Sequence, residues 1–283
     1  MNPVLISKPE EMQEICMARN RQKCLIALVP TMGALHAGHR ALIREGRKRG
    51  DLLVVSIFVN PSQFAPGEDL NRYPRTLQAD LAMCGEEGVD YVFHPPAETM
   101  YPPSYRTYLQ VEGLSGRLCG ISRPTHFRGV STIVARLFLI TQANMAIFGW
   151  KDAQQFLILR RMVSDLHMPV EMVAVETIRE NSGLALSSRN KYLTPQEKQE
   201  ASVLYRSLQE ARSLHERNPS LPAEALRKTV ESKIRSESSG RIDYIEFVDM
   251  ELLEPVTSIL PGNTLLALAC YWGKTRLIDN IRL

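Results

Sequence analysis

The sequence lacks the features that mark secreted, membrane-spanning and nucleic-acid-binding proteins. Its five cysteines are scattered and odd in number, which favours reduced thiols in the cytoplasm over a disulfide framework. No stretch approaches the roughly 18 consecutive apolar residues of a membrane span, and the N-terminal segment carries acids where a secretory signal would be apolar. The net charge of +3 is small, and the aromatic residues do not alternate with a basic stripe. We therefore expect a cytoplasmic globular enzyme or binding protein, with neither a membrane nor a nucleic acid as partner.

Two familiar nucleotide-binding loops are also missing. No dinucleotide-binding G-x-G-x-x-G occurs in the chain. Gly273, Lys274 and Thr275 resemble the end of a Walker A loop, but Leu268 occupies the position of its first glycine. The five thiols lack a nearby base that would activate a nucleophile. Any phosphate chemistry in this chain must therefore use another kind of loop.

Short apolar runs alternate with helical patterns up to about residue 180, which predicts a parallel β-sheet covered by helices. The runs are residues 24–29, 52–59, 91–94, 145–149 and 170–178. Apolar residues at three- and four-residue spacing predict core-facing helices near 128–142 and 153–166. Residues 107–111, TYLQV, alternate like an exposed strand, which would suit the edge of a dimer.

The chain is long enough for one large domain or two unequal ones. Two polar amphipathic helices and two strand-like runs follow the alternating part, over residues 195–216, 222–237, 243–250 and 263–272. Helices followed by strands predict a smaller α+β domain. We place the boundary near residue 180, with one domain over 1–180 and a small lid domain over 181–283.

The most informative stretch is PTMGALHAGH, residues 30–39, directly after the first apolar run. It places His36 and His39 where a buried strand passes into a helix, and ligands bind just outside the carboxyl end of such a strand in open α/β sheets. Free backbone N–H groups of the loop and a helix N-terminus would favour an anion there. Histidines at this turn can donate hydrogen bonds to oxygens that gain charge as a phosphoryl bond breaks. The stretch therefore predicts phosphate chemistry without a P-loop.

The same histidine pair could instead hold a metal ion, because imidazole suits zinc. The metalloprotease pattern, however, spaces its histidines four residues apart with Glu beside the first. Here Ala37 follows His36, and no other His or Cys cluster lies nearby in sequence. We favour the phosphate interpretation on this count of ligands.

The second apolar run ends in SIFVNPSQF, residues 56–64, which offers Asn60 and Gln63. Their uncharged amides can both donate to and accept from hydroxyl and carbonyl groups. An Asn-Pro turn could by itself explain Asn60 and Pro61, but it does not require Gln63. The loop is therefore a candidate for substrate recognition.

A third strand end, FGWKDAQQF at residues 148–156, repeats this arrangement. Gly149 permits close approach of the backbone, and Lys151 supplies a cation. Asp152 could hold ribose hydroxyls or simply cap the following helix. Asp152 and Gln155 are three residues apart, so they lie on one helical face.

The segment GLALSSRNKYL, residues 183–193, lies at the expected boundary. The segment could wrap a polyphosphate with its two serines, an asparagine and Arg189. The guanidinium of Arg189 can donate two parallel hydrogen bonds to phosphate oxygens. A Ser-rich boundary segment could equally be a solvated linker. His126 precedes another helix, where it could bind a ligand or satisfy a buried hydrogen bond.

The H-x-G-H pair after the first run and the Ser-Ser-Arg loop after the last resemble the nucleotidylyltransferase superfamily. The full set of motifs, in its order along the chain, resembles the pantoate–β-alanine ligase family, and the resemblance covers essentially the whole chain. These motifs are PTMGALHAGH, SIFVNPSQF, YPRTLQAD, RPTHFRGVSTIVARLF, FGWKDAQQF and GLALSSRNKYL. The resemblance implies a Rossmann-like doubly wound parallel sheet with a smaller C-terminal α+β domain. It also implies a homodimer that ligates pantoate and β-alanine through a pantoyl-adenylate, using ATP and Mg²⁺ and releasing AMP and pyrophosphate.

The resemblance also assigns ATP contacts. In the first loop these are Met32, Gly33, Ala34, Leu35, His36, Ala37, Gly38 and His39. Elsewhere they are Gly149, Trp150, Lys151, Asp152, Ile178, Leu186, Ser187, Ser188 and Arg189. His36, His39, Lys151 and Arg189 would be catalytic, with His39 as the proton donor. Lys151 would lie near the α-phosphate, Asp152 near the ribose and Ile178 against adenine.

The remaining implied roles concern the other substrates. Gln63 and Gln155 would grip pantoate, with Gln63 also near β-alanine and Asn60 as a further candidate. Asp80 in YPRTLQAD is a candidate acid on the magnesium side. These assignments follow from the resemblance and not from spacing.

The chain departs from the family pattern at Trp150 and Cys119, where acidic residues are common. Neither position carries bond making, so the departures concern fine tuning and interface contacts. Two other functions stay open: a nucleotidyltransferase that acts on a phosphorylated acceptor, and a non-catalytic ATP-binding regulator. The amide side chains of the candidate substrate site suit hydroxyls and a carboxylate better than a phosphate.

Overall fold

The computed structural model describes residues 2–65 and 67–283, which divide into two compact units. The first unit comprises Met1–Gly116, Gly120–Trp150 and Ile158–Glu176. The second comprises Arg117–Cys119, Lys151–Leu157 and Thr177–Leu283. We expected a single boundary near residue 180, whereas two short earlier segments also group with the second unit.

Six strands form the sheet of the first unit, and all their pairings are parallel. They are β1 (Val4–Ile6), β2 (Ile26–Thr31), β3 (Leu52–Ile57), β4 (Tyr91–Phe93), β5 (Met145–Gly149) and β6 (Glu171–Val175). Their order across the sheet is β1-β4-β3-β2-β5-β6. This is the Rossmann-like sheet that we expected: four of the five predicted apolar runs contain one of its strands, and the run over 24–29 overlaps β2, which continues to Thr31.

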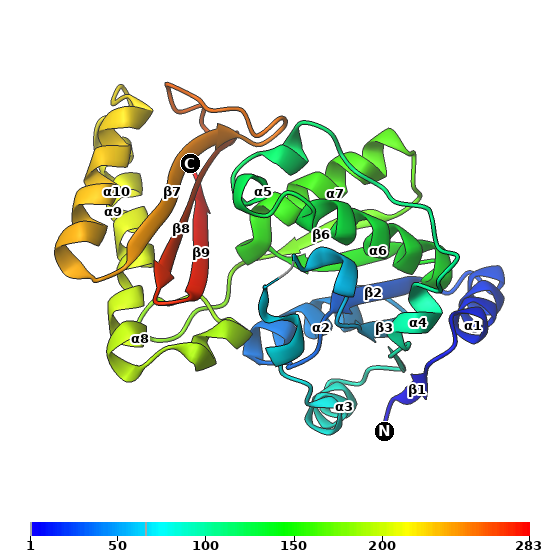
Figure 1. Cartoon of the computed structure of the whole chain (residues 1–283). Coiled ribbons are helices and arrows are strands. Elements are labelled where there is room, and N and C mark those ends of the chain that lie inside the picture. The colour runs from blue at the N-terminus through cyan, green and yellow to red at the C-terminus, as the bar shows by residue number, and fades with distance from the viewer. Residues whose placement is uncertain (1, 66) are drawn as a thin grey trace. The chain divides into compact units, whose positions relative to one another are not determined.

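Burial on both faces explains why these runs are almost continuously apolar. All six residues of β3 are buried, as in parallel sheets that helices cover on both sides. The covering helices are α1 (Pro9–Arg21), α2 (Ala37–Arg49), α3 (Leu77–Glu86) and α6 (His126–Thr141). Ile43 of α2 and Cys84 of α3 pack with alternate strand residues such as Val55 on one face, and α1 and α6 lie on the other (Figure 1).

The chain reverses its direction across the sheet at β2 and β5. From β2 it runs through α2 to β3, whereas from β5, on the opposite side of β2, it runs on to β6. Ligands of open α/β sheets bind outside the carboxyl ends of the strands at such a switch point. The topology therefore predicts a ligand at the ends of β2 and β5, where PTMGALHAGH and FGWKDAQQF begin their loops.

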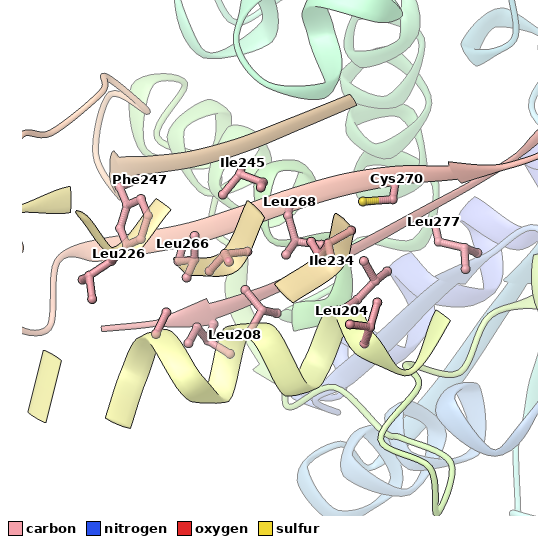
Figure 2. Close-up of a cluster of buried hydrophobic side chains, with 14 of the residues drawn as sticks. Leu204, Leu208, Leu226, Ile234, Ile245, Phe247, Leu266, Leu268, Cys270 and Leu277 are labelled. Carbon is pink, nitrogen blue, oxygen red and sulfur yellow. The ribbon is translucent and has the colours of Figure 1, made fainter. Parts of the chain in front are cut away.

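The second unit contains an antiparallel sheet in the order β7-β8-β9. Its elements are α8 (Pro195–Ala201), α9 (Val203–Arg217), α10 (Ala223–Glu237), β7 (Arg241–Asp249), β8 (Thr264–Trp272) and β9 (Thr275–Arg282). Figure 2 shows the core of this unit, in which Leu208 of α9 and Leu226 of α10 join Leu266 of β8. The antiparallel strands and their helices form the smaller α+β domain that we expected.

Three local predictions differ from the structure. Residues 107–111 form no strand, because the Leu109 amide donates to Thr132 Oγ1 (2.9 Å) and the Arg128 guanidinium covers the Tyr108 ring, so this segment packs on α6. The helix expected over 195–216 is two helices, α8 and α9, which meet at Ser202. Strands β1 and β9 were not predicted.

The remaining elements are short, except for α7. They are α4 (Ala97–Met100), α5 (Cys119–Ser122), α7 (Ala153–Asp165), η1 (Pro61–Gln63), η2 (Asp69–Arg72), η3 (Leu114–Gly116), η4 (Trp150–Asp152) and η5 (Ser188–Tyr192), where η denotes a 3₁₀ helix. Across residues 2–65 and 67–283, none of the helices has the length and apolar character needed to cross a membrane.

Candidate active site

The loop between β2 and α2 is held in an unusual backbone conformation. Gly33 and Ala34 have φ angles of +84° and +52°, in the left-handed region. The Gly33 amide donates to Thr31 Oγ1 (3.1 Å), and the next two amides, of Ala34 and Leu35, donate to the Asp80 carboxylate at 3.0 and 2.8 Å. Three consecutive amides therefore bind side chains of the protein itself.

His36 and His39 form a reciprocal cap at the start of α2. The Gly38 amide donates to His36 Nδ1 (3.1 Å), and the His36 amide donates to His39 Nδ1 (3.3 Å). An imidazole nitrogen that accepts a hydrogen bond carries no proton, so each neutral ring keeps its proton on Nε2. The ring centroids are 4.1 Å apart, and both side chains are half-buried. The pair therefore presents two Nε2–H donors from one turn.

These contacts revise one expectation about how the loop would bind an anion. We expected free backbone amides between the strand and the helix, but those of Gly33 to His36 and of Gly38 are already bonded within the protein. The donors that the geometry offers to a phosphate are the two imidazoles. The expectation of free amides at these positions was therefore wrong, and the phosphate-binding role of the two histidines stays a prediction.

The loop after β3 is organised by Asn60, which is 1% exposed. Its Nδ2 donates to Gln63 Oε1 (3.0 Å) and to the Gly129 carbonyl (3.1 Å). Its Oδ1 accepts from Ser62 Oγ and from the Tyr101 hydroxyl, both at 2.9 Å. The amide of Asn60 is thus used inside the protein, where it orients the Gln63 side chain.

The RPTHFRGV segment, residues 123–130, leads into helix α6 and supports the same loop. A Cβ on Gly129 would lie 2.4 Å from the Ser62 carbonyl oxygen, so only glycine allows this approach. The Gln63 carbonyl accepts from His126 Nδ1 (2.9 Å), so His126 makes a partly buried hydrogen bond within the protein. Arg123 donates two hydrogen bonds to the Glu68 carboxylate. Burial alone would raise the pKa of Glu68, but the hydrogen bonds from Arg123 hold that pKa below its ordinary value.

In the second unit, the backbone at Lys151 is anchored by Asn280 of β9, whose Nδ2 donates to the Lys151 carbonyl (3.0 Å). The Lys151 ammonium lies 3.5 Å from Asp152 Oδ1, and the Asp152 side chain is half exposed. Gln155 follows on the first turn of α7 and is partly exposed. Trp150, by contrast, is 5% exposed, so its indole faces the protein interior.

The segment that carries Ser187, Ser188 and Arg189 is an ordered turn and not an open linker. Leu186 donates to the Ile178 carbonyl (2.9 Å) across a small hairpin. Ser187 caps η5 by accepting from the Arg189 amide (3.2 Å). Ile178 is 37% exposed, an apolar surface of the kind that an adenine ring could cover.

Sequence reasoning missed the ion pair that fixes this hairpin. Arg179 donates to both carboxylate oxygens of Asp279 (2.6 and 2.9 Å), and its guanidinium stacks 3.8 Å above the Tyr205 ring. Asp279 is 2% exposed. No signal in the sequence pairs residues one hundred positions apart, although Arg179 directly follows Ile178.

The two departures from the family pattern occupy interior positions. Cys119 Sγ lies 3.3 Å from both the Tyr244 hydroxyl and the Arg276 guanidinium, which also pairs with Asp243. Burial, together with Cys119, raises the pKa of Tyr244 well above its usual range. The Cys119 thiol thus faces a cation, which is a position that an acidic side chain would also suit.

The protein itself offers no metal cage in the part of the chain that the structure describes. No group of three or more His, Cys, Asp or Glu side chains there could hold a metal ion. Asp80, the candidate acid, is 2% exposed and has both oxygens engaged by loop amides.

Comparison with known proteins identifies the family. The sequence profile of the family described as Pantoate-beta-alanine ligase matches residues 4–282. The pantothenate synthetase of Pseudothermotoga lettingae is 48% identical to this chain, and the match covers 98% of both proteins. That of Geotalea uraniireducens is 50% identical, and the match covers 98% of this chain and 97% of the relative. The crystal structure of pantothenate synthetase from Thermus thermophilus matches with a TM-score of 0.91 and 42% identity, over 99% of both chains.

A further crystal structure is that of the pantoate-beta-alanine ligase from Francisella tularensis, complexed with Beta-gamma ATP and β-alanine. It matches with a TM-score of 0.78 and 31% identity, over 99% of this chain and 97% of that one. The similarity spans both units. The chain therefore belongs to the pantoate–β-alanine ligase family.

Proposed function

We propose that this chain joins pantoate to β-alanine in two steps, through a pantoyl-adenylate formed on ATP. The family match over residues 4–282 carries the proposal. ATP use is supported by the Francisella tularensis relative, which was solved with Beta-gamma ATP and β-alanine. A carboxylate is a poor acyl donor until its oxygen belongs to a good leaving group, and adenylation provides one. The products are pantothenate, AMP and pyrophosphate.

In the first step a carboxylate oxygen of pantoate attacks the α-phosphorus, and the bond to pyrophosphate breaks. The Nε2–H groups of His36 and His39 donate hydrogen bonds to phosphate oxygens as they gain charge, which lowers the barrier. His39 acts as a hydrogen-bond donor through its Nε2–H, since its Nδ1 accepts from the His36 amide, and Lys151 neutralises charge near the α-phosphate. The amides of Gln63 and Gln155 orient the hydroxyls and the carboxylate of pantoate.

In the second step the amine of β-alanine attacks the acyl carbon of the adenylate. The new C–N bond replaces the C–O bond to AMP, and the amine loses a proton. Gln63, which Asn60 holds in place (3.0 Å), orients the reacting groups. Exclusion of water matters here, because an acyl-adenylate is readily hydrolysed.

The remaining ATP contacts are proposed for the second unit. Ser187, Ser188 and Arg189 bind the β- and γ-phosphates, because the start of η5 offers hydroxyls, and an arginine fork suits phosphate oxygens. Ile178 packs on adenine and Asp152 binds the ribose hydroxyls. Arg179 and Asp279 keep this segment in shape through their paired hydrogen bonds.

Mg²⁺ fits the site only as a companion of ATP. Magnesium usually keeps several waters and binds through substrate phosphates together with one or two carboxylates. Since Asp80 is engaged by loop amides, we propose that the phosphates supply the ligands. When bound, the ion would neutralise charge on the polyphosphate.

Product analysis tests the proposed function. Incubation with ATP, Mg²⁺, pantoate and β-alanine should yield pantothenate, AMP and pyrophosphate in equal amounts. A product that retains the nucleotide, with no amide formed, would instead indicate a nucleotidyltransferase. ATP binding without turnover would indicate a regulator.

We also propose that the chain forms a homodimer, as membership of the family implies. The exposed strand first expected at 107–111 no longer supports this, since the segment packs on α6. Sedimentation should give twice the chain mass of 32.0 kDa, and a monomer at all concentrations would contradict the proposal.

A further inference from the structure

Asp80 is a buried carboxylate that, among residues 2–65 and 67–283, accepts its hydrogen bonds from two backbone amides and one hydroxyl. It lies on the first turn of α3 and is 2% exposed. Its Oδ2 accepts from the Ala34 amide (3.0 Å), and its Oδ1 accepts from the Leu35 amide (2.8 Å) and from Thr76 Oγ1 (3.2 Å). Burying a carboxylate is unfavourable unless hydrogen bonds replace its water. Here backbone dipoles and one hydroxyl replace that water.

The loop conformation and the carboxylate depend on each other. Successive backbone N–H groups in a tight turn can form a concave anion-binding nest, and the turn here places Gly33 and Ala34 at positive φ angles. Non-glycine residues persist there only when their surroundings hold them. A Cβ on Gly33 would lie 3.1 Å from Asp80 Oδ2 and 3.0 Å from Ile57, so the carboxylate fits closely against the loop. The anion in this nest is the protein's own.

We propose that Asp80 is a positioning residue, which fixes the loop so that His36 and His39 present their Nε2–H groups. The connection is short, because the Leu35 amide bound to Asp80 immediately precedes His36. The His36 amide in turn donates to His39 Nδ1. Asp80 thus acts through the backbone on both imidazoles, and it is not a magnesium ligand. This inference rests on the proposed function only for its effect on turnover.

Two variants test the role. Asp80→Asn keeps the size and shape of the side chain but turns an NH₂ group toward one of the loop amides, so the hydrogen bond from that amide is lost. Thr76→Val keeps the carboxylate and removes only its hydroxyl donor. Asp51→Asn is the matched control, because Asp51 also accepts a backbone bond, from Leu25 (2.9 Å), but at the amino end of β3.

Hydrogen exchange of the nucleotide-free protein is the first readout, and it does not depend on activity. For Asp80→Asn we expect exchange of the peptide over residues 33–36 to rise about tenfold. Thr76→Val should produce a smaller rise, and the control variant none in this peptide. Unchanged exchange in both Asp80→Asn and Thr76→Val would overturn the proposal, and Thr76→Val alone decides if Asp80→Asn does not fold.

The magnesium requirement is the second readout. For Asp80→Asn we expect kcat to fall about 10²-fold, because misplaced donors no longer match the transition state. The Mg²⁺ concentration for half-maximal activity should stay within about twofold of the wild-type value. A rise of about tenfold or more in that concentration would instead make Asp80 a metal ligand. If the wild-type protein makes no pantothenate, the proposed function fails while the exchange result still stands.

Discussion

The chemistry assigned to His36 and His39 depends on which ring nitrogen keeps the proton. Both Nδ1 atoms accept backbone hydrogen bonds, so the structure selects the Nε2–H tautomer for each neutral ring. A donor that is fixed before the substrate arrives needs little reorganisation during the reaction. This explains how two neutral side chains can stabilise charge on a phosphate.

Substitution of His39 can separate its two roles, the acceptance of the His36 amide by Nδ1 and the donation of a hydrogen bond by Nε2–H. His39→Asn retains an oxygen that can accept the His36 amide but loses the Nε2–H, so we expect kcat to fall roughly 10²–10³-fold, about 2.7–4 kcal/mol. ATP binding, measured by calorimetry, should be largely retained. His39→Gln, which can place an N–H near Nε2, should recover part of the activity.

A control for these variants is His167→Asn, since His167 is exposed and has a φ of +47°, which asparagine tolerates. Its kcat should equal that of the wild type. A loss of less than about tenfold in His39→Asn would remove His39 from the proposed role.

Residue type and spacing located the candidate residues but not the direction in which each side chain points. Asn60 and Asp80 were expected to face substrate or magnesium, yet both are buried and hydrogen-bonded within the protein. The partners of Asp80, at Ala34 and Leu35, lie more than forty positions away. Such contacts arise only when the sheet brings two loops together, so a single sequence could not predict them.

At the scale of elements, the strands were predictable because both of their faces are buried. β3 and β5 appear as apolar runs for this reason. β9 was missed because it carries Arg276, Asp279 and Arg282 among its apolar residues. Asp279 is nevertheless buried, since Arg179 pairs with it. Strand recognition from apolar runs fails where ion pairs replace hydrophobic contacts.

The contact between α6 and η1 gives a steric prediction. In Gly129→Ala the new Cβ would meet the Ser62 carbonyl and the Gln63 amide, at 2.4 and 2.6 Å. We expect a loss of about 1–3 kcal/mol in the free energy of unfolding, and a higher KM for pantoate because Gln63 moves. Gly116→Ala is the control, since its Cβ would meet nothing within 4 Å. Equal KM values for both variants would contradict the account of this loop.

Glu200 of α8 gives a pH prediction. Hydrogen bonds from the Ser239 side chain and amide, and then from Gln196, lower its pKa to about 2 from 4.5. The folded state therefore binds fewer protons than the unfolded state between these values. The resulting stabilisation is present above pH 4.5 and disappears as the pH falls toward 2.

Denaturant unfolding of Glu200→Gln checks this. The free energy of unfolding of the variant should be lower than that of the wild type by about 1 kcal/mol at pH 7. The value is small because water screens the partly exposed carboxylate. The difference from the wild type should shrink steadily below pH 4.5. A difference that stays constant from pH 7 to pH 3 would show that the charge of Glu200 plays no part.

At the scale of the whole molecule, the two units do not follow the order of the chain. Arg117–Cys119 and Lys151–Leu157 belong to the second unit although first-unit residues flank them. Gln154 connects these segments, since it donates to the Arg117 carbonyl and accepts from the Cys119 amide. The change in sequence pattern, with its boundary placed near residue 180, indicated a second domain. It could not reveal the segments that join it through tertiary contacts.

The lid role that we expected for residues 181–283 makes a prediction for limited proteolysis. Binding of ATP phosphates by Ser188 and Arg189 should order residues 180–192 and slow cleavage there. The protection should require ATP and be strongest with pantoate present. Cleavage at an unchanged rate under all conditions would count against a lid.

The central claim is that a pantoyl-adenylate forms before β-alanine reacts, and isotope exchange tests it most directly. The measurement is the pantoate-dependent incorporation of labelled pyrophosphate into ATP, with Mg²⁺ present and β-alanine absent. The account predicts exchange that stops when pantoate is withheld and that falls about as steeply as kcat in His39→Asn, roughly 10²-fold or more. Pantothenate synthesis without any such exchange would contradict the two-step reaction.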